Sequence, residues 1–196
     1  IPENMPYGEP GGPDSEVFYE FDDISHDKKF GEFCHPNCDC GKFLEIGNSV
    51  FMEYKKLFDG SFEKLMQKNV DFGGGLERIT AVSENNSDIF SIDVFQLIIE
   101  HIEKLSGKTY SEKNHQKSFR IIADHIRAAF FLIADGISPS NTDQGYFIRR
   151  LIRRSVRHMD LLGIKEGNLY MLSDTLAIYY EDSYPEMKRN LQKIKD

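Results

Sequence analysis

The chain has 196 residues, 40% of them hydrophobic, which is enough for one large domain or two small ones with an apolar core. It contains neither an apolar run long enough to cross a membrane nor a signal-peptide pattern. The three cysteines are odd in number and closely clustered, which argues against a disulfide framework and for a reducing, cytoplasmic setting. Because the sequence starts at Ile1 within a turn-rich stretch, we expect it to be a fragment or the product of processing.

Charge is distributed unevenly along the chain. Residues 1–100 carry 20 acidic and 8 basic side chains, whereas residues 101–196 carry 12 and 16, within a net charge of −8. This asymmetry predicts two functional halves, the second with a polyanionic partner. A solvated surface with randomly scattered charge explains the same numbers, and composition leaves both interpretations open.

The first part of the chain has the pattern of loops and strands. Residues 1–16 are rich in Pro and Gly, and residues 24–41 have no periodicity, so we expect loop or insertion in both. Residues 16–23 alternate apolar and acidic side chains, which predicts a strand. Residues 42–57 are rich in β-branched and aromatic side chains, which predicts a strand interrupted at its glycine. A short third strand is expected at residues 69–72.

The rest of the chain has the pattern of helices. A first helix is expected to begin at the end of the glycine run, near residue 75. Apolar residues then recur at helical spacing in longer runs that end at glycines. We expect these helices at residues 89–107, 118–136 and 144–163, followed by one more helix and a partial last one in residues 168–196.

These elements predict an α+β protein with two parts. The linker NNSD at residues 85–88 separates them. Part of an antiparallel sheet is expected in residues 1–86, followed by an all-helical domain in residues 87–196.

The stretch VDFGGGLERI, residues 70–79, places three glycines between a strand and a helix. Glycines without a Cβ let a ligand approach the backbone, and the helix start offers free N–H groups to an anion. Arg78 adds a planar cationic fork suited to phosphate, and Asp71 could hold an ammonium group. Such a segment suits an amino acid beside a nucleotide triphosphate, although a tight turn with a surface ion pair fits the same pattern.

The stretch QGYFIRRLIRRSVRH, residues 144–158, is strongly basic. Its apolar side chains fall on one side of the expected helix: Phe147, Ile148, Leu151, Ile152, Val156 and Met159. Its arginines fill the other side: Arg149, Arg150, Arg153, Arg154 and Arg157. Five arginines so close together repel one another unless an anion binds there, which favours an RNA stem held by its phosphates. A solvated helix paired with acidic side chains of the same chain is the alternative.

The cluster CHPNCDC offers ligands for a metal ion. Cys34, Cys38 and Cys40, with His35 adjacent, could build a tetrahedral zinc site. Joint ligation by the neighbours Cys34 and His35 is awkward, and free thiols in a loop are the alternative.

Four stretches resemble class II aminoacyl-tRNA synthetases, and the alanyl-tRNA synthetases in particular. Residues 70–79 are similar to motif 3 of that class. GPDSEVFYE at residues 12–20 resembles the alanyl stretch G-P-x-S-E-I-F-Y-D, and KFLEIGNSVFMEY at residues 42–54 resembles R-F-L-E-I-W-N-L-V-F-M-Q-Y. Residues 118–158 match the helical tRNA-recognition segment almost continuously. The resemblance implies a ligase that joins alanine to tRNA-Ala through an alanyl-adenylate made from ATP.

The resemblance also implies roles for individual residues in ATP binding. Arg78 would hold the γ-phosphate of ATP and is the implied catalytic residue. Gly73, Gly74 and Gly75 would let the adenine and ribose lie against the backbone.

The same resemblance implies an alanine site. Asp71 would bind the ammonium group, Gly73 would lie beside the substrate, and Val50 would help bound a pocket for the methyl group. Such a pocket discriminates weakly against glycine and serine, because one methylene or hydroxyl is worth only about 1–3 kcal/mol.

A magnesium site is implied by the E-x-x-N pair Glu45 and Asn48, since Mg²⁺ prefers carboxylate, amide and water oxygens. Residues three apart in a regular strand face opposite sides, so a kink or bulge at Gly47 is needed to bring them together.

The tRNA partner is implied to bind through its acceptor stem. Asn141 would read the G·U pair in the shallow minor groove, and Arg149, Arg150, Arg153 and Arg157 would contact the stem.

Two departures from the family pattern concern the substrate pocket and the completeness of the site. Gly47 stands where the family has Trp, and Phe72-Gly73-Gly74-Gly75 stands for Thr-Gly-Met-Gly. The motif 2 arginine for the α-phosphate is expected upstream of Ile1, so this segment alone is expected to be inactive in adenylation. A non-catalytic RNA-binding module derived from a synthetase is the alternative function.

Overall fold

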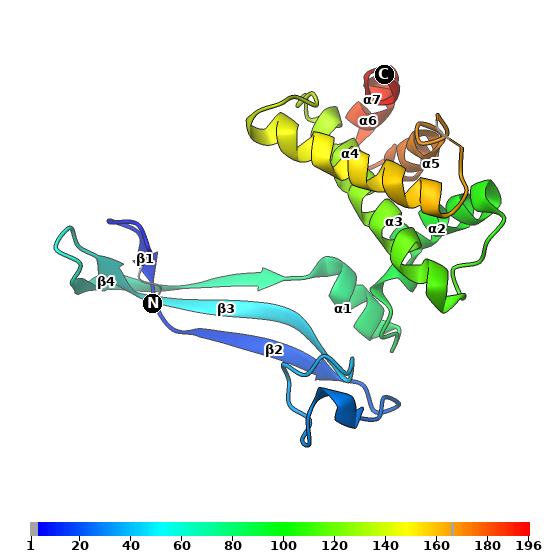
Figure 1. Ribbon diagram of the computed structural model, residues 1–196. Coiled ribbons are helices and arrows are strands. Elements are labelled where there is room, and N and C mark those ends of the chain that lie inside the picture. The colour runs from blue at the N-terminus through cyan, green and yellow to red at the C-terminus, as the bar shows by residue number, and fades with distance from the viewer. Residues whose placement is uncertain (1–3, 166) are drawn as a thin grey trace. The chain divides into compact units, whose positions relative to one another are not determined.

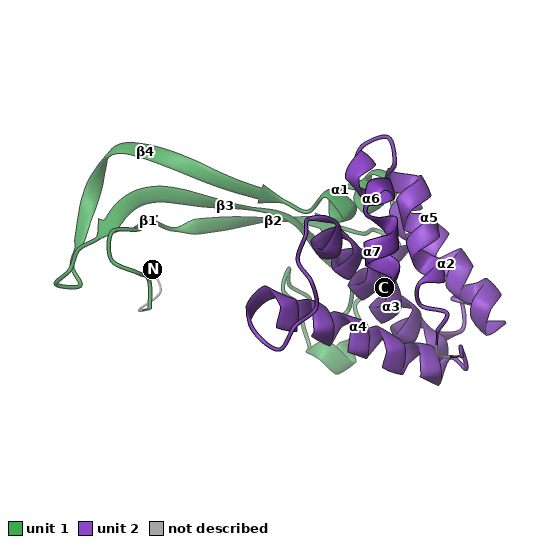
Figure 2. Cartoon of the chain, turned by 90° about the horizontal axis from the view of Figure 1, so that it is seen from above, with its two compact units in different colours: residues 1–89 green, residues 90–196 purple. Residues whose placement is uncertain are grey.

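The structure, a computed structural model, describes residues 4–165 and 167–196. The chain divides into two compact units, Ile1–Ile89 and Phe90–Asp196, which Figure 2 shows in different colours. The first unit contains an antiparallel sheet and the second is helical, so the predicted α+β class is confirmed. Among the described residues, no helix is long and apolar enough to cross a membrane.

Unit 1 is built around one long central strand, β3 (Phe43–Lys56). β4 (Phe62–Gly74) pairs antiparallel along one edge of β3, and β1 (Pro10–Gly11) and β2 (Asp14–Glu20) pair antiparallel along the other edge. Figure 1 shows these strands running side by side, with the short helix α1 (Leu76–Ser83) directly after β4. The segment between β2 and β3 contains the 3-10 turn η1 (Lys28–Phe30).

Two sequence predictions for the sheet need correction. β3 is continuous through Gly47 rather than interrupted there, because the irregularity is absorbed as a bulge. β4 begins at Phe62, well before the expected residues 69–72. Most of its side chains are exposed and many are polar, so the strand lacks the apolar alternation by which a half-buried strand is recognised.

The described residues of unit 2 form four substantial helices and two short ones. The substantial helices are α2 (Asp93–Ser106), α3 (Lys113–Ala134), α4 (Asp143–Leu161) and α5 (Met171–Tyr180). The 3-10 turn η2 (Ile89–Ser91) precedes them, and α6 (Pro185–Arg189) and α7 (Leu191–Lys195) follow. α2 ends where the sequence predicted, because Gly107 adopts a left-handed φ of 66° that is costly for other residues.

The helix α3 forms the centre of unit 2 and packs against α2, α4, α5 and α7. Its inward face is apolar apart from Ser118, and Phe119, Ile122 and Ala123 are fully buried. The α4 residue Ile148 is fully buried against α3. Burying such side chains stabilises a helical unit by about 1.5–3 kcal/mol each, so α3 fixes the position of α4.

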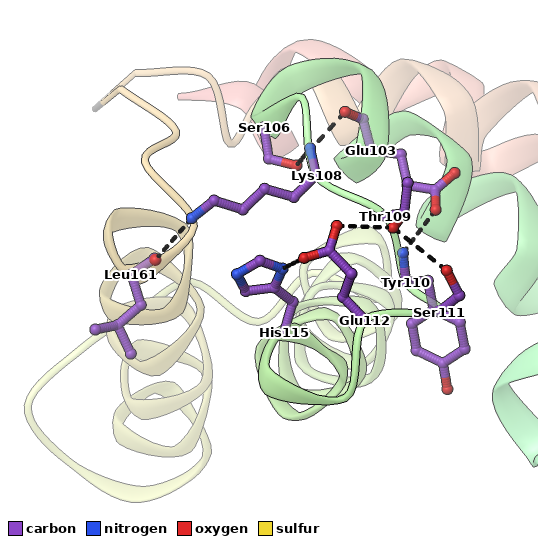
Figure 3. Close-up of polar contacts among 9 residues, drawn as sticks. All are labelled: Glu103, Ser106, Lys108, Thr109, Tyr110, Ser111, Glu112, His115 and Leu161. Atoms are coloured by element: carbon purple, nitrogen blue, oxygen red, sulfur yellow. Dashed lines mark hydrogen bonds and ion pairs between the residues drawn. The ribbon is translucent and has the colours of Figure 1, made fainter.

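Polar contacts fix the turn between α2 and α3 (Figure 3). The carboxylate of Glu103 accepts a hydrogen bond from the backbone N–H of Tyr110 at 2.7 Å. Lys108 donates to the carbonyl oxygen of Leu161, the last residue of α4, at 3.3 Å. A cation at this place also complements the partial negative charge of the helix C-terminus.

The basic helix α4 has a narrower buried face than the sequence predicted. Gly145, Ile148, Ser155 and Met159 are buried, and the five arginines lie exposed on the other side. Phe147 is 53% exposed and Val156 is 38% exposed, so neither belongs to the core face.

Candidate functional site

A bulge in β3 shapes the centre of the sheet. Across from β2, Gly47 pairs with Val17 and Glu45 pairs with Phe18, so Ile46 has no partner between them. The inserted residue shifts the alternation of side chains by one position. The bulge expected near Gly47 is therefore present, at the neighbouring residue.

The bulge brings the two expected magnesium ligands to one face. Asn48 lies opposite Glu16 and Glu45 lies opposite Phe18. Glu16 and Phe18 are two apart in β2, so they share a face, and their partners share it too. Glu45 and Asn48 are thus on the same face although they are three apart in sequence.

The expected alanine-binding residues occupy this same face. Val50 pairs with Asp71 of β4, and Asn48 pairs with Gly73. Directly opposite residues of an antiparallel pair project to the same side of the sheet. The ligand face, as we call it, therefore carries Glu45, Asn48, Val50, Asp71 and Gly73.

The start of α1 is tied to the bulge. The backbone N–H of Gly75 donates to the carbonyl oxygen of Ile46 at 3.0 Å. The Nη1 atom of Arg78 donates to the carbonyl oxygen of Glu45 at 2.9 Å and lies 3.3 Å from its carboxylate. The carbonyl of Ile46 thus holds the backbone before α1, and the carbonyl of Glu45 holds the guanidinium of Arg78 beside the Glu45 carboxylate.

The glycines at residues 73 and 75 lie in different surroundings. A Cβ on Gly75 would lie 3.1 Å from Cδ of Arg78, because the arginine side chain folds over this residue. A Cβ on Gly73 would meet no atom within 4 Å. No described neighbour requires a glycine there, which leaves the space above Gly73 open on the ligand face.

Gly47, which departs from the family pattern, lies against the ring of Phe72. A Cβ on Gly47 would lie 2.9 Å from the Phe72 ring. Phe72 pairs with Ser49, so it projects from the face opposite the ligand face. The aromatic ring that β4 supplies at Phe72 therefore covers Gly47, where the family pattern has a tryptophan on β3.

The ligand face is more acidic than the sequence reasoning recognised. Asp14 pairs with Val50, and Glu16 pairs with Asn48, so both carboxylates join Glu45 and Asp71. The amide of Asn48 lies 3.5 Å from Asp14. Carboxylate and amide oxygens are suitable ligands for Mg²⁺, so the donor set fits that ion. The two carboxylates lie in the stretch GPDSE, where the sequence reasoning expected loop up to residue 16, but the strand β2 already begins at Asp14.

Four of the expected tRNA-binding residues of unit 2, Asn141, Arg149, Arg150 and Arg153, line one groove. This groove of about 380 Å³ is lined by Asn141, Tyr146, Arg149, Arg150, Arg153 and Arg154. The sequence reasoning did not select Tyr146, whose ring lies under the guanidinium of Arg150 at 6.0 Å. Arg157 is exposed on the same helix but does not line the groove.

The arginines of α4 have no acidic partner among the described residues. Arg149 instead donates to the side-chain oxygen of Asn141. The positive field acts on His158, whose pKa is lowered by burial first and then by Arg154 and Arg157. The groove thus keeps its positive charge available for an external anion.

The loop that carries Asn141 is packed tightly against α4. A Cβ on Gly145 would lie 2.3 Å from Oγ of Ser140 and 2.5 Å from the carbonyl oxygen of Ser138. The hydroxyl of Ser140 also donates to the carbonyl oxygen of Thr142 at 2.8 Å. Gly145 therefore permits the close approach that places Asn141 at the groove.

The cysteine cluster gains a partner that the sequence reasoning missed. The side chains of Cys34, Cys38 and Cys40 gather with His26, and their potential ligand atoms all lie within 4.8 Å of one another. His35, the histidine considered from the sequence, is exposed instead. No motif pointed to His26, because it lies eight residues before Cys34 in a segment without periodicity.

Comparison with known proteins identifies the family to which the chain belongs. The family model described as tRNA synthetases class II (A) matches residues 3–196. The chain belongs to this family of class II tRNA synthetases. Its similarity to alanyl-tRNA synthetases extends over nearly its whole length.

The curated relatives are alanine–tRNA ligases. That of Borreliella afzelii is 43% identical over 189 residues, which make up 95% of this chain and 31% of that protein. Those of Idiomarina loihiensis and Staphylococcus aureus are 43% and 41% identical over 187 residues, 95% of this chain and 21% of each relative. The chain therefore spans well under half the length of the relatives that it matches.

Proposed function

We propose that this chain supplies part of the ATP and alanine site and the acceptor-stem-binding helices of an alanine–tRNA ligase. The reaction joins alanine to ATP as an alanyl-adenylate with release of pyrophosphate, and then transfers alanine to tRNA-Ala. Residues 1–86 form the half of the catalytic domain that contains motif 3, and residues 87–196 form the tRNA-recognition domain.

In this proposal, unit 1 acts by positioning and by charge. Asp71 binds the ammonium group of alanine, and Val50, its neighbour across the strands, contacts the methyl group. The backbone at Gly73, Gly74 and Gly75 receives the adenine and ribose of ATP. Arg78 binds the γ-phosphate, which gains a permanently charged partner suited to bidentate contact. Holding both substrates on one rigid sheet is the main source of catalysis for such a reaction.

The residues Glu45 and Asn48 would hold Mg²⁺, which would neutralise phosphate charge when bound. Their shared face supports this assignment. Glu45 now pairs with Arg78, so ATP and the ion would each take one partner of this pair. Arg78 is thereby kept close to the place where the phosphates arrive.

Unit 2 binds the acceptor stem of tRNA-Ala through the groove beside α4. Arg149, Arg150, Arg153 and Arg157 contact phosphates, and Asn141 reads the G·U pair. Stacking and amide contacts are suited to the minor groove of A-form RNA, where base edges are accessible.

One observation carries the proposal: the bulge at Ile46 aligns Glu45, Asn48, Val50, Asp71 and Gly73 on a single face next to Arg78. An RNA-binding module needs no such alignment of carboxylates and an open glycine.

The test is a chimera in which this segment replaces its counterpart in the Staphylococcus aureus relative. We expect alanine-dependent exchange of pyrophosphate into ATP. Asp71→Asn should raise the KM for alanine by about tenfold or more with little change in the KM for ATP, since a hydrogen bond to a charged group contributes about 1.5–3 kcal/mol. Glu63→Gln, in the same strand but paired with Lys55, is the matched control and should change neither value.

Two outcomes would contradict the proposal. A folded chimera that binds the tRNA-Ala acceptor hairpin but forms no alanyl-adenylate would indicate an RNA-binding module. An Asp71→Asn variant with an unchanged KM for alanine would remove Asp71 from the substrate site.

A further inference from the structure

The segment between β2 and β3 holds a compact cluster of soft ligands. It comprises His26, Cys34, Cys38 and Cys40, which we call the His–Cys cluster. Cys38 is 7% exposed and the other three side chains are half-buried. The segment lies beyond the paired part of β2 and β3 (Figure 1), so the cluster is separate from the ligand face.

The distances within the cluster fit a tetrahedral zinc ion. Zn–S bonds of about 2.3 Å and Zn–N bonds of about 2.0–2.1 Å place two sulfurs about 3.8 Å apart and a sulfur and a nitrogen about 3.6 Å apart. The Sγ atoms of Cys34 and Cys40 are 3.6 Å apart, and Sγ of Cys38 is 3.6 Å from Nδ1 of His26. A disulfide would need about 2.05 Å, and all three cysteines are free.

The histidine is oriented for ligation by a contact outside the cluster. The Nε2 atom of His26 lies 2.9 Å from the carbonyl oxygen of Gly31. A carbonyl accepts only from a protonated nitrogen, so this contact assigns the proton to Nε2 and leaves the lone pair on Nδ1. Metal-binding histidines commonly use their second nitrogen in this way. Nδ1 is the atom that faces Cys38.

The segment has little else to hold its fold. Among its described residues from Asp22 to Lys42, Cys38 is the one buried apolar side chain, and Phe33 is 77% exposed. Connections this long without regular structure are uncommon unless they are functional or constrained. Ordering each backbone residue costs about 1–2 kcal/mol, and apolar burial here cannot offset that cost.

We propose that His26, Cys34, Cys38 and Cys40 bind one structural Zn²⁺ ion in a closed tetrahedral site. All four positions come from the protein, so the ion has no open position for catalysis. The ion clamps the segment at the base of the hairpin, where Phe21 N–H donates to Lys42 C=O at 2.9 Å. It thereby fixes the start of β3 at Phe43, two residues before Glu45. This assignment does not depend on the proposed aminoacylation role.

The test combines metal analysis with substitutions at the two candidate histidines. The 196-residue chain, purified under reducing conditions, should contain one zinc per molecule. His26→Ala should weaken zinc binding by about 100-fold or more, since even loss of a second-shell partner costs 10–100-fold. His35→Ala is the matched control and should bind zinc as the parent chain does. Cobalt substitution should give sulfur-to-metal charge-transfer absorption in the parent chain.

Two further measurements separate metal loss from general unfolding. His26→Cys should keep one zinc per chain with an altered cobalt spectrum. Chelation should raise hydrogen exchange in residues 22–42 and leave α3 unchanged. A reduced parent chain without zinc, or a His26→Ala variant that binds zinc as tightly as His35→Ala, would overturn the proposal. So would a Cys34–Cys40 disulfide that persists in the reduced protein.

Discussion

Unit 2 buries apolar side chains on each helix from α2 to α6, whereas the described residues of unit 1 bury only Phe21, Cys38 and Ala81 to a similar degree. The strands of unit 1 instead leave large apolar side chains exposed, among them Met66, Val70 and Phe72. The helical unit is therefore stabilised by its own core. The sheet unit is organised by backbone pairing, by the bulge at Ile46 and by hydrogen bonds from α1.

This difference explains what each unit can offer to a ligand. A sheet that buries little of itself presents carboxylates and open backbone over a wide surface. A packed helical unit presents charge along one rigid helix, because the opposite side of α4 is fixed against α3. The two candidate sites thus depend on different kinds of interaction, and substitutions should affect them differently.

The largest expected effect distinguishes the two units by their packing. Phe119→Ala, at a fully buried site in α3, should lower the free energy of unfolding of unit 2 by about 3–5 kcal/mol. Phe72→Ala, at a site 61% exposed in β4, should change the stability of the sheet by less than about 1 kcal/mol. Urea unfolding followed by helical circular dichroism measures the first, and hydrogen exchange of the β3 and β4 amides measures the second.

The proposed difference between the units would be wrong if Phe119→Ala and Phe72→Ala lowered the free energy of unfolding by the same amount. A loss of several kcal/mol for Phe72→Ala would mean that the sheet has a core that its exposure does not reveal. A loss below about 1 kcal/mol for Phe119→Ala would mean that α3 is not the packing centre of unit 2.

The sequence predicted the elements of unit 2 better than those of unit 1, because unit 2 buries far more apolar side chains. Burial on one side imposes a helical period on apolar residues, so α2 was expected to end at Gly107 and does. β4 is exposed on most of its length, so only its last residues had a recognisable pattern. Spacing placed Phe147 on the apolar side of the expected helix, but the buried stripe of α4 is narrow and this ring is exposed.

The candidate sites were predictable only where chemistry is local in sequence. The glycine run and Arg78 are contiguous, and the arginines of α4 recur within two turns, so both patterns are visible in the sequence. The juxtaposition of Glu45 with Asn48 depends on the bulge, which the E-x-x-N spacing required but could not locate. His26 reaches Cys38 only through the fold of the segment after β2, so no spacing rule indicated it.

A smaller effect depends on whether an arginine in each unit has an acidic partner. Arg78 in unit 1 already has Glu45 as a partner at 3.3 Å, whereas the described residues offer Arg153 in α4 no carboxylate. Arg153→Ala should therefore weaken binding of a tRNA-Ala acceptor hairpin and lower the slope of log affinity against log salt by about one. Arg189→Ala, in α6 and 3.9 Å from Glu186, is the control and should leave the slope unchanged.

The salt titration decides whether α4 contacts phosphate. An unchanged slope for Arg153→Ala would remove this residue from the RNA interface. A reduced slope for Arg189→Ala of equal size would show that general surface charge, rather than the groove beside α4, governs the affinity.

The smallest expected effect tests, in the absence of RNA, the positive electrostatic potential that the arginines of α4 create. Burial, followed by Arg154 and Arg157, holds the pKa of His158 below its ordinary value, while Ser118 lies 3.0 Å from its Nδ1. The neutral ring is thus favoured in the folded state, so the unfolded chain takes up a proton first as the pH falls through about 6.5. Unit 2 should lose stability below that pH and keep it above.

Arg154→Gln should raise the pKa of His158, measured by NMR titration of its ring protons, while leaving it below the ordinary value, because burial is the larger cause. The loss of stability on acidification should shrink accordingly. Binding of an acceptor hairpin to the parent chain should move the pKa in the same direction, since phosphates screen the arginines that now act on the ring. A pKa that responds to neither change would mean that burial alone sets it and that the arginine field does not reach the core side of α4.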